Sequence, residues 1–321
     1  MEDAMHFPAP GKIDVHHHIR PPGSAAAGLR EWSATSALED MEANGIGFAV
    51  TYPGFVAESS EMNRSAPDQA RSINEFSANL SRAYPTRFGM YATLPMSDVE
   101  QCLDEIAYCS DVLGCAGFAM VTSYGDKWLG DPAYEPIFDE LNRRRAVVFV
   151  HPTDFSSSPT SYGSGQVTGP WLEWPTSTAR TILNLILTGT LRKNPDIKFI
   201  FCHGGGVMPM IVSRIAGFTG WREMGKERMK ELFPEGIHSQ FASLNFELAQ
   251  AFAPENFHAL NQLVPSSRML FGSDWDNFEI GHSVRSFDSL NLDTETSHAI
   301  SRGNALRLFE CLTETGAVSE F

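Results

Sequence analysis

Short apolar runs alternate with longer amphipathic segments along nearly the whole chain. The runs are rich in β-branched and aromatic residues, which favours strands. The longer segments place apolar residues three or four positions apart, which favours helices. The sequence predicts eight strands, the seventh with the weakest pattern, at residues 12–19, 46–52, 87–94, 116–121, 147–151, 197–203, 240–247 and 269–274.

Capping patterns and glycines mark the helices between these runs. Residues 36–39 and 97–100 have the Ser-x-x-Glu form of a capping box, and Gly45 and Gly114 end the helices that follow. Residues 152–175 form a long loop rich in Ser, Gly and Pro, a length typical of functional loops. Further helices are predicted at residues 66–84, 134–144, 176–189, 255–264 and 294–312, with another that opens at the glycine run 204–206.

Strands that alternate with helices predict a parallel sheet, because a crossover helix brings the chain back to the start of the next parallel strand. Eight such units in 321 residues predict a (β/α)8 TIM barrel of the α/β class, as a single domain spanning residues 1–321. Active sites of this fold lie at the C-terminal ends of the strands, so candidate chemistry is expected there.

Composition narrows the class of protein. The net charge of −15 argues against a nucleic-acid partner, and no apolar run reaches the length of a membrane span. Five cysteines without framework spacing indicate a reducing compartment. The first residues have neither the basic region nor the apolar core of a signal peptide. These features predict a cytoplasmic protein.

Two histidines close the first predicted strand. Side chains alternate along a strand, so His16 and His18 share one face, an arrangement that suits a divalent metal ion. Three later predicted strands end in further metal-capable side chains, those of His151, His203 and Asp274. Because the C-terminal strand ends of a barrel meet around one opening, these residues predict a single metal site.

These motifs resemble the amidohydrolase superfamily, and within it the branch of aminocarboxymuconate-semialdehyde decarboxylase and the metal-dependent hydroxybenzoate decarboxylases. The resemblance covers nearly the whole chain, and the ordered set of motifs is far more specific than one His-x-His. The motifs are Asp14-Val15-His16-His17-His18, residues 141–144 leading to Val148-Phe149-Val150-His151-Pro152, His203-Gly204-Gly205-Gly206 with Pro209 and Arg214-Ile215, and Phe271-Gly272-Ser273-Asp274-Trp275.

The resemblance implies a role for each of these side chains. It makes His16, His18, His151 and Asp274 the metal ligands, and His203 the residue that hydrogen-bonds water at the metal. Zn2+ suits three imidazoles and one carboxylate, with Mn2+ and Mg2+ as alternatives.

Two segments depart from the family pattern. Asp274-Trp275-Asp276 stands where the family usually has Asp-Tyr-Pro or Asp-Trp-Pro. Phe246-Glu247-Leu248-Ala249 replaces the usual Asp-Thr-Ala or Asp-Ala after strand seven. Both departures bear on the shape of the pocket and leave the metal ligands in place.

Three residues are candidates for binding substrate. Arg20 has the parity of His16, so a longer first strand would aim its guanidinium over the metal at a substrate carboxylate; a solvated arginine is the open alternative. Trp171, in the long loop, either faces the substrate or caps the barrel. By its spacing from His203, Arg222 matches an arginine that reaches a neighbouring subunit's active site in the decarboxylase, which implies a homodimer.

The resemblance implies a metal-dependent, non-oxidative decarboxylase of a small aromatic or dienoic acid, such as an ortho-hydroxybenzoate like 6-methylsalicylate. The proton for the ring carbon would come either from Asp274 or through His203. A lactone- or amide-opening hydrolase of the same superfamily would use the same residues and stays open, although no lysine ends strand four or five to bridge two metals. A barrel that binds metal only as a scaffold is the third hypothesis.

Overall fold

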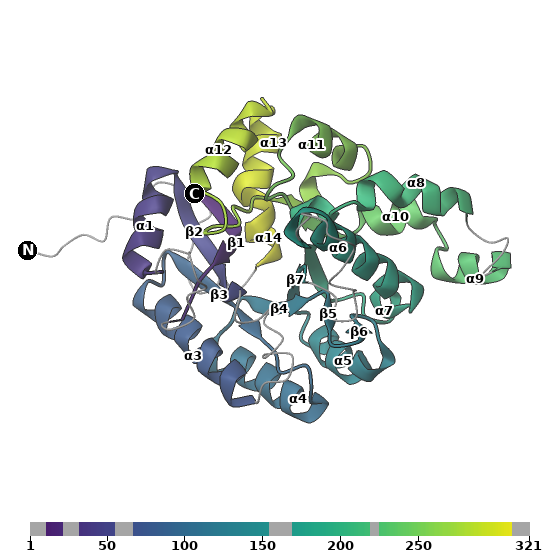
Figure 1. The fold of residues 1–321 in the computed structure, drawn as a ribbon, viewed down its shortest axis with the longest axis horizontal. Coiled ribbons are helices and arrows are strands. Elements are labelled where there is room, and N and C mark those ends of the chain that lie inside the picture. The colour runs from purple at the N-terminus through teal and green to yellow at the C-terminus, as the bar shows by residue number, and fades with distance from the viewer. Residues whose placement is uncertain (1–10, 22–31, 55–66, 154–168, 219–224, 310–321) are drawn as a thin grey trace, which may run out of the picture.

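The computed structural model describes residues 11–21, 32–54, 67–153, 169–218 and 225–309. Within these ranges eight parallel strands form one sheet, each beside the strand that follows it in the chain, with helices on the outside (Figure 1). A short hairpin, β5 (Ser123–Tyr124) and β6 (Lys127–Trp128), lies apart from the sheet. The strands of the sheet are β1 (Lys12–His18), β2 (Ile46–Tyr52), β3 (Phe88–Thr93), β4 (Gly117–Val121), β7 (Val147–His151), β8 (Lys198–Phe201), β9 (Asn245–Glu247) and β10 (Met269–Leu270).

The helices connect successive strands, as right-handed crossovers require. Helices α8 to α10 make the bulkiest connection, and they project to one side of the molecule (Figure 1). The helices are α1 (Ala34–Ala43), α3 (Pro67–Ala83), α4 (Val99–Tyr108), α5 (Glu135–Arg143), α6 (Gly169–Leu187), α7 (Thr190–Lys193), α8 (Met208–Phe218), α9 (Gly225–Leu232), α10 (Ile237–Ala242), α11 (Pro254–Asn261), α12 (Ile280–Ser289), α13 (Thr294–His298) and α14 (Asn304–Leu308).

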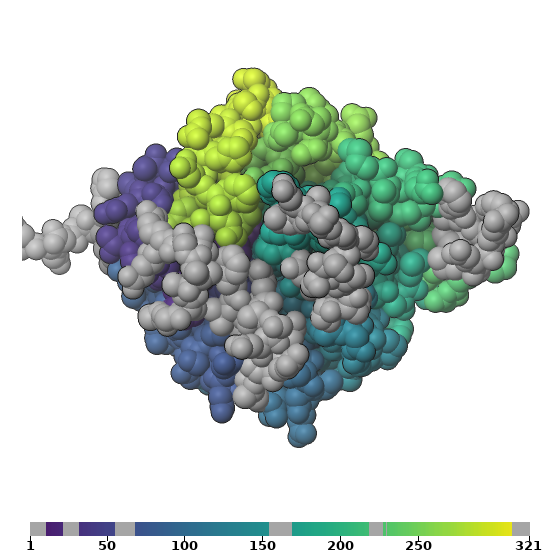
Figure 2. Space-filling view, in the orientation of Figure 1, coloured from purple at the N-terminus to yellow at the C-terminus, as the bar shows by residue number. Residues whose placement is uncertain are grey.

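The sheet closes where β1 meets the segment that follows β10. The Val15 amide donates to the Phe271 carbonyl at 3.0 Å, and the Asp274 amide donates to the His16 carbonyl at 2.8 Å. Figure 2 shows the same closure from outside, since the purple segments from early in the chain lie directly beside the yellow segments from late in it. The predicted (β/α)8 barrel is therefore confirmed.

The barrel interior is a packed core rather than a channel. Inward-facing strand residues form their own apolar cluster, and Ala305 and Phe309 of the α14 region join it. The Leu308 carbonyl accepts a hydrogen bond from Lys198 at the start of β8, so α14 covers the N-terminal end of the barrel. The strand members of the cluster are Ile13, Val15, Phe48, Val50, Tyr52, Tyr91, Ala119, Val147, Phe149, Ile200, Cys202 and Leu270.

Both predicted capping boxes are misplaced, the first by three residues and the second by one. The cap of α1 is Ser33, whose hydroxyl accepts from the Ser36 amide, and the cap of α4 is Asp98, whose carboxylate accepts from the Gln101 amide. Several Ser and Asp residues precede each helix, and the sequence does not show which of them adopts the extended backbone of a cap.

Other boundaries differ where packing overrides local pattern. Helix α6 begins at Gly169, so the loop predicted through residue 175 is wrong for its last seven residues. The predicted strand 240–247 begins within the helix α10, and only its last three residues, β9, are strand. The predicted helix 294–312 is interrupted by a π-helical turn, Ala299–Gly303, between α13 and α14.

Among the described helices, none combines the length and the apolar character needed to cross a bilayer. The cytoplasmic location stays a prediction.

Candidate metal centre

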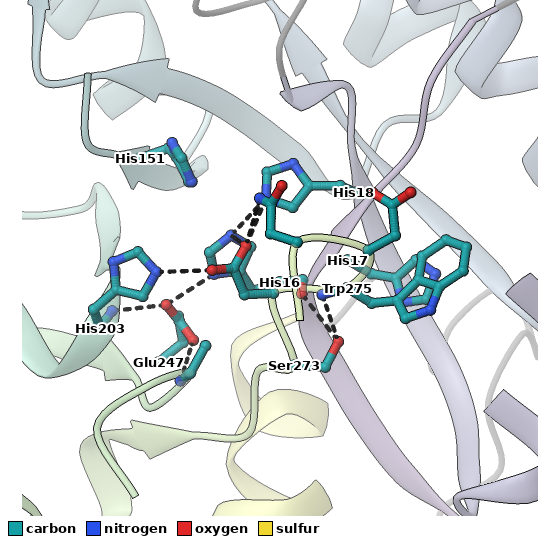
Figure 3. Close-up of polar contacts among 12 residues, drawn as sticks. His16, His17, His18, His151, His203, Glu247, Ser273 and Trp275 are labelled. Carbon is teal, nitrogen blue, oxygen red and sulfur yellow. Dashed lines mark hydrogen bonds and ion pairs between the residues drawn. The ribbon is translucent and has the colours of Figure 1, made fainter. Parts of the chain in front are cut away.

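Four metal-capable side chains converge at the C-terminal ends of the strands. His16 and His18 lie on β1, His151 ends β7, and Asp274 follows β10. All four are buried, and one ligand atom from each lies within 4.8 Å of the others. Figure 3 shows His16, His18 and His151 around a common space, with His203 alongside.

The contacts between these side chains fit a shared cation. His16 Nε2 lies 3.1 Å from His18 Nε2, and Asp274 Oδ1 lies 2.9 Å from the same His18 nitrogen. Two ring nitrogens at this separation repel each other unless a proton or a metal ion lies between them. Three imidazoles and one carboxylate are also a usual donor set for a divalent transition metal, so the residues fit the implied ion.

The charges around the cluster attract a cation. Burial disfavours a charged His16, but the carboxylates of Glu247 and Asp274 outweigh burial and raise the pKa of His16 to about 9. Burial lowers the pKa of His18 against the opposing pull of Asp274. Burial opposes ionisation of Asp274 too, yet its histidine neighbours hold the pKa of its carboxyl well below the usual range. The carboxylate is therefore ionised, as a metal ligand must be.

A β-bulge in β1 sets the direction of the histidines. Between Asp14 and His17 the register with β2 shifts, so Val15 and His16 together oppose one residue of β2. Val15 fills the barrel interior, while the His16 ring packs edge-on against Phe149 with a centroid separation of 5.0 Å. His16 and His18 thus share a face, as strand parity predicts.

Glycine makes room for one of these rings. A Cβ on Gly54 would lie 2.2 Å from His18 Nδ1, inside van der Waals contact. Only glycine at this position, two residues after the end of β2, lets the His18 ring keep its place.

His203 follows β8 and Asp274 follows β10, and the two side chains face each other across the strand between them, β9. His203 Nε2 lies 3.4 Å from Asp274 Oδ2, and both residues have a left-handed backbone, with φ of 55° and 58°. Such backbone is costly for residues other than glycine and concentrates at functional sites. The His203 side chain is 13% exposed, unlike the buried ligands, so it is the histidine that a molecule entering the site would meet.

The sequence analysis missed Glu247 as a functional residue. Its carboxylate is fully buried and lies 2.9 Å from His16 Nδ1, on the side of the ring away from the metal ligands (Figure 3). Glu247 ends β9, and an acidic residue at the C-terminal end of a barrel strand was the available signal.

Asn277 is a second residue that the sequence analysis missed. Its side-chain amide donates to Asp274 Oδ1 at 3.0 Å, next to the contact with His18. This bond fixes the rotation of the carboxylate.

The predicted substrate residues have different surroundings. Arg20 is buried, and its guanidinium is paired with Asp276 through contacts of 2.6 and 2.7 Å, a partner that the sequence analysis did not predict. Trp171 lies in the first turn of α6 and is 75% exposed, whereas the Trp174 ring lies 5.7 Å from the His151 ring. Arg222 lies outside the described residues.

Behind the ligands, Asp14 ties β1 to the segment after β10. Its carboxylate accepts from the Ser273 hydroxyl at 2.5 Å and from His17 Nδ1 at 3.0 Å. The His17 ring stacks on Trp275 with centroids 4.7 Å apart, on the side of the strand away from the metal ligands (Figure 3).

Comparison with known proteins places this geometry in a family. The family model described as Amidohydrolase matches residues 13–311. Decarboxylase yanB of Aspergillus niger is 32% identical over 93% of this chain and 87% of its own length. The 6-methylsalicylic acid decarboxylase of Penicillium expansum is 30% identical over 93% of this chain and 96% of its own.

A solved structure agrees in fold. The dihydroxybenzoic acid decarboxylase of Polaromonas, with bound manganese and the inhibitor 2-nitroresorcinol, superposes with a TM-score of 0.81 at 21% identity, over 98% of this chain and 100% of that one. The family match and the relatives at 30–32% identity confirm the resemblance seen in the motifs. This chain belongs to the amidohydrolase family.

Proposed function

We propose that the chain is a metal-dependent, non-oxidative decarboxylase of a hydroxybenzoate such as 6-methylsalicylate. The observation that carries the proposal is the buried set of three imidazoles and one carboxylate, with His203 directed at Asp274. The relatives named as decarboxylases, one of them for 6-methylsalicylic acid, support the reaction and the substrate class.

The reaction replaces the carboxylate on a ring carbon with hydrogen and releases CO2. The ring carbon first takes up a proton with a π electron pair of the electron-rich ring. The bond to the carboxylate carbon then breaks and returns its electron pair to the ring, so CO2 leaves and no oxidant is needed. An aryl anion without that proton would be too high in energy. A group in the site must therefore donate the proton directly to the ring carbon. We assign this role to the pair of Asp274 and His203, whose facing atoms lie 3.4 Å apart.

His16, His18, His151 and Asp274 are the proposed metal ligands. A divalent ion held by these four residues would supply Lewis-acid stabilisation of the negative charge on the substrate oxygens. The protein keeps these donors buried, where charges interact more strongly than in water. We propose Zn2+ because it suits His3Asp, with Mn2+, present in the Polaromonas structure, and Mg2+ as the alternatives.

The substrate contacts are also proposals. Arg20 would hold the substrate carboxylate, with its guanidinium kept in place by Asp276. Trp171 would cover the ring of the substrate, joined by Trp174 because of its position against His151. Arg222 would come from the neighbouring subunit of a homodimer.

The test combines metal analysis with a screen for CO2 release over hydroxybenzoates, with lactones in parallel. We expect about one divalent ion per chain and CO2 release from an ortho-hydroxybenzoate. His151→Ala should remain folded but lose the metal and the activity, whereas His258→Ala, at an exposed position on α11, should keep both. Lactone opening without CO2 release would make the protein a hydrolase, and full metal content in His151→Ala would contradict the assigned site.

A further inference from the structure

The Glu247 carboxylate receives hydrogen bonds from three separate places. Its Oε1 lies 2.9 Å from His16 Nδ1 and 2.7 Å from the His203 backbone nitrogen. Its Oε2 accepts from the Ala249 amide at 2.7 Å. Glu247 itself is 0% exposed, so no water competes for these bonds.

The bond to His16 sets the tautomer of that ring. Because a carboxylate only accepts, His16 carries a hydrogen on Nδ1, so Nε2, on the side of the other proposed ligands, is the nitrogen that can bind a metal ion. A carboxylate behind a metal-binding imidazole also makes the imidazole a stronger donor to the metal.

The hydrogen bond between Glu247 and His203 holds the His203 backbone rather than its ring. His203 has a φ of 55°, a conformation that needs support from its surroundings. Its amide hydrogen is held by the same oxygen that holds His16, so one atom fixes both the ligand and the histidine that faces Asp274.

The surroundings are shaped to the carboxylate. A Cβ on Gly272 would lie 2.1 Å from Glu247 Oε2 and 3.0 Å from the His16 Cβ. Gly272 is not among the residues with positive φ, so it provides space at this position rather than an unusual backbone conformation. Gly272, which follows Phe271, thus leaves the space that the side chain of Glu247 occupies at the end of β9.

We propose that Glu247 is a positioning residue that couples metal affinity to the placement of His203. It is not a ligand of a second ion shared with His16 and His203, because two of its three donors are backbone N–H groups, which cannot turn away to admit a cation. The proposal rests on the proposed metal-dependent function, but its main readout does not require decarboxylation.

The test compares Glu247→Gln with a matched control, Glu105→Gln. Glu105 is also a buried glutamate, 2% exposed and bonded by Asn74 and Arg71, but it lies on α4 outside the metal cluster. For each variant three quantities are measured: the Zn2+ affinity of the metal-free protein by competition with a chelator, the melting temperature without metal, and kcat and KM at saturating Zn2+.

Glu247→Gln should weaken Zn2+ binding by about 10- to 100-fold, and kcat should stay reduced by about tenfold or more at saturating Zn2+ with KM little changed. Glu105→Gln should lower the melting temperature and leave Zn2+ affinity and kcat unchanged. Zn2+ affinity and kcat in Glu247→Gln equal to those of the wild type or of Glu105→Gln would overturn the proposal.

If Glu247→Gln does not fold, Gly272→Ala decides, because it keeps every polar group and displaces only the carboxylate and the neighbouring His16. Its expected and contrary results are the same as for Glu247→Gln. A wild type that binds Zn2+ but releases no CO2 would contradict only the proposed reaction. The Zn2+ affinities of the variants would then still decide the role of Glu247. A wild type that binds none of Zn2+, Mn2+ and Mg2+ overturns both.

Discussion

The two carboxylate oxygens of Asp274 have different partners. Oδ1 lies beside His18 and accepts from Asn277, whereas Oδ2 faces His203. One oxygen is thus placed with the metal ligands and the other with the proposed acid–base histidine. In the proposed function, this division would separate metal binding from proton transfer within one side chain.

His203→Asn tests that division. The variant should keep most of its metal, because the four proposed ligands are untouched, while kcat falls by a factor of about 10²–10⁴, the usual range for a lost acid–base group. Metal content by elemental analysis and single-turnover rates are the measurements. Loss of the metal together with the rate would make His203 a ligand.

At the scale of residues, the sequence predicts which side chains share a face of one strand better than it predicts contacts between strands. The period of two along a strand is enough to put His16 and His18 on one face. Glu247 meets His16 across 231 positions of sequence, and Asp276 meets Arg20 across 256. Such pairs depend on the tertiary positions of segments that are distant in the sequence, and a local sequence pattern does not predict these positions.

At the scale of elements, Asp14 joins β1 to the segment after β10. Its carboxylate accepts from the Ser273 amide, the Ser273 hydroxyl, His17 and the His16 amide, all in a buried setting.

Asp14→Asn would remove the charge and turn an amide group toward these donors, so the free energy of unfolding should fall by about 2–4 kcal/mol. Urea denaturation measures the loss. Asp98→Asn, which retains an N-cap residue on α4, should change stability by less than about 0.5 kcal/mol. Equal effects of the two substitutions would contradict a special role for Asp14.

Helix α5 ends in an ion network that should be sensitive to acid. Hydrogen bonds from Arg143 lower the pKa of Glu140 from 4.5 to about 2, with burial opposing and Arg144 adding to the effect. Because the folded state binds this proton less tightly than the unfolded chain, the stabilisation is full above about pH 4.5 and disappears as the pH falls toward 2.

Glu140→Gln should therefore lower stability near pH 7 by about 1–2 kcal/mol, a value reduced for the exposure of Arg143, with a deficit that shrinks below pH 4.5. Denaturation at a series of pH values gives the difference. Glu39→Gln, on the exposed side of α1, is the control. A deficit independent of pH would mean that packing, not charge, is responsible.

The alternation of strands and helices is predictable because the spacing of apolar residues along the chain differs between the two. The first seven residues of α6 were not predicted as helix because Pro175 is read as a helix breaker. In the structure the Thr176 and Thr178 hydroxyls bond carbonyls of the preceding turn, and the Pro175 carbonyl accepts from Val207. These contacts stabilise a helix that the local sequence argues against.

At the scale of the whole molecule, the prediction is a dimer in which Arg222 acts across the interface. Arg222→Ala should cut kcat/KM by about ten- to a hundredfold with metal content unchanged, since a charge-assisted hydrogen bond contributes roughly 1.5–3 kcal/mol. Mixing Arg222→Ala subunits with Asp274→Asn subunits creates one site with both residues intact, so activity should partly return. No recovery in a verified heterodimer, or a fully active monomer, would refute the idea.

The closure of the barrel places ligands from its two edges in contact. His18 and Asp274 are 256 residues apart in the chain, yet they touch once β1 meets the segment after β10. A ribosome therefore releases the two histidines of β1 long before the carboxylate that completes their set exists. The proposed ligand set is therefore complete only after residue 274 has been synthesised, and we expect a nascent chain to bind the ion less tightly than the finished protein does.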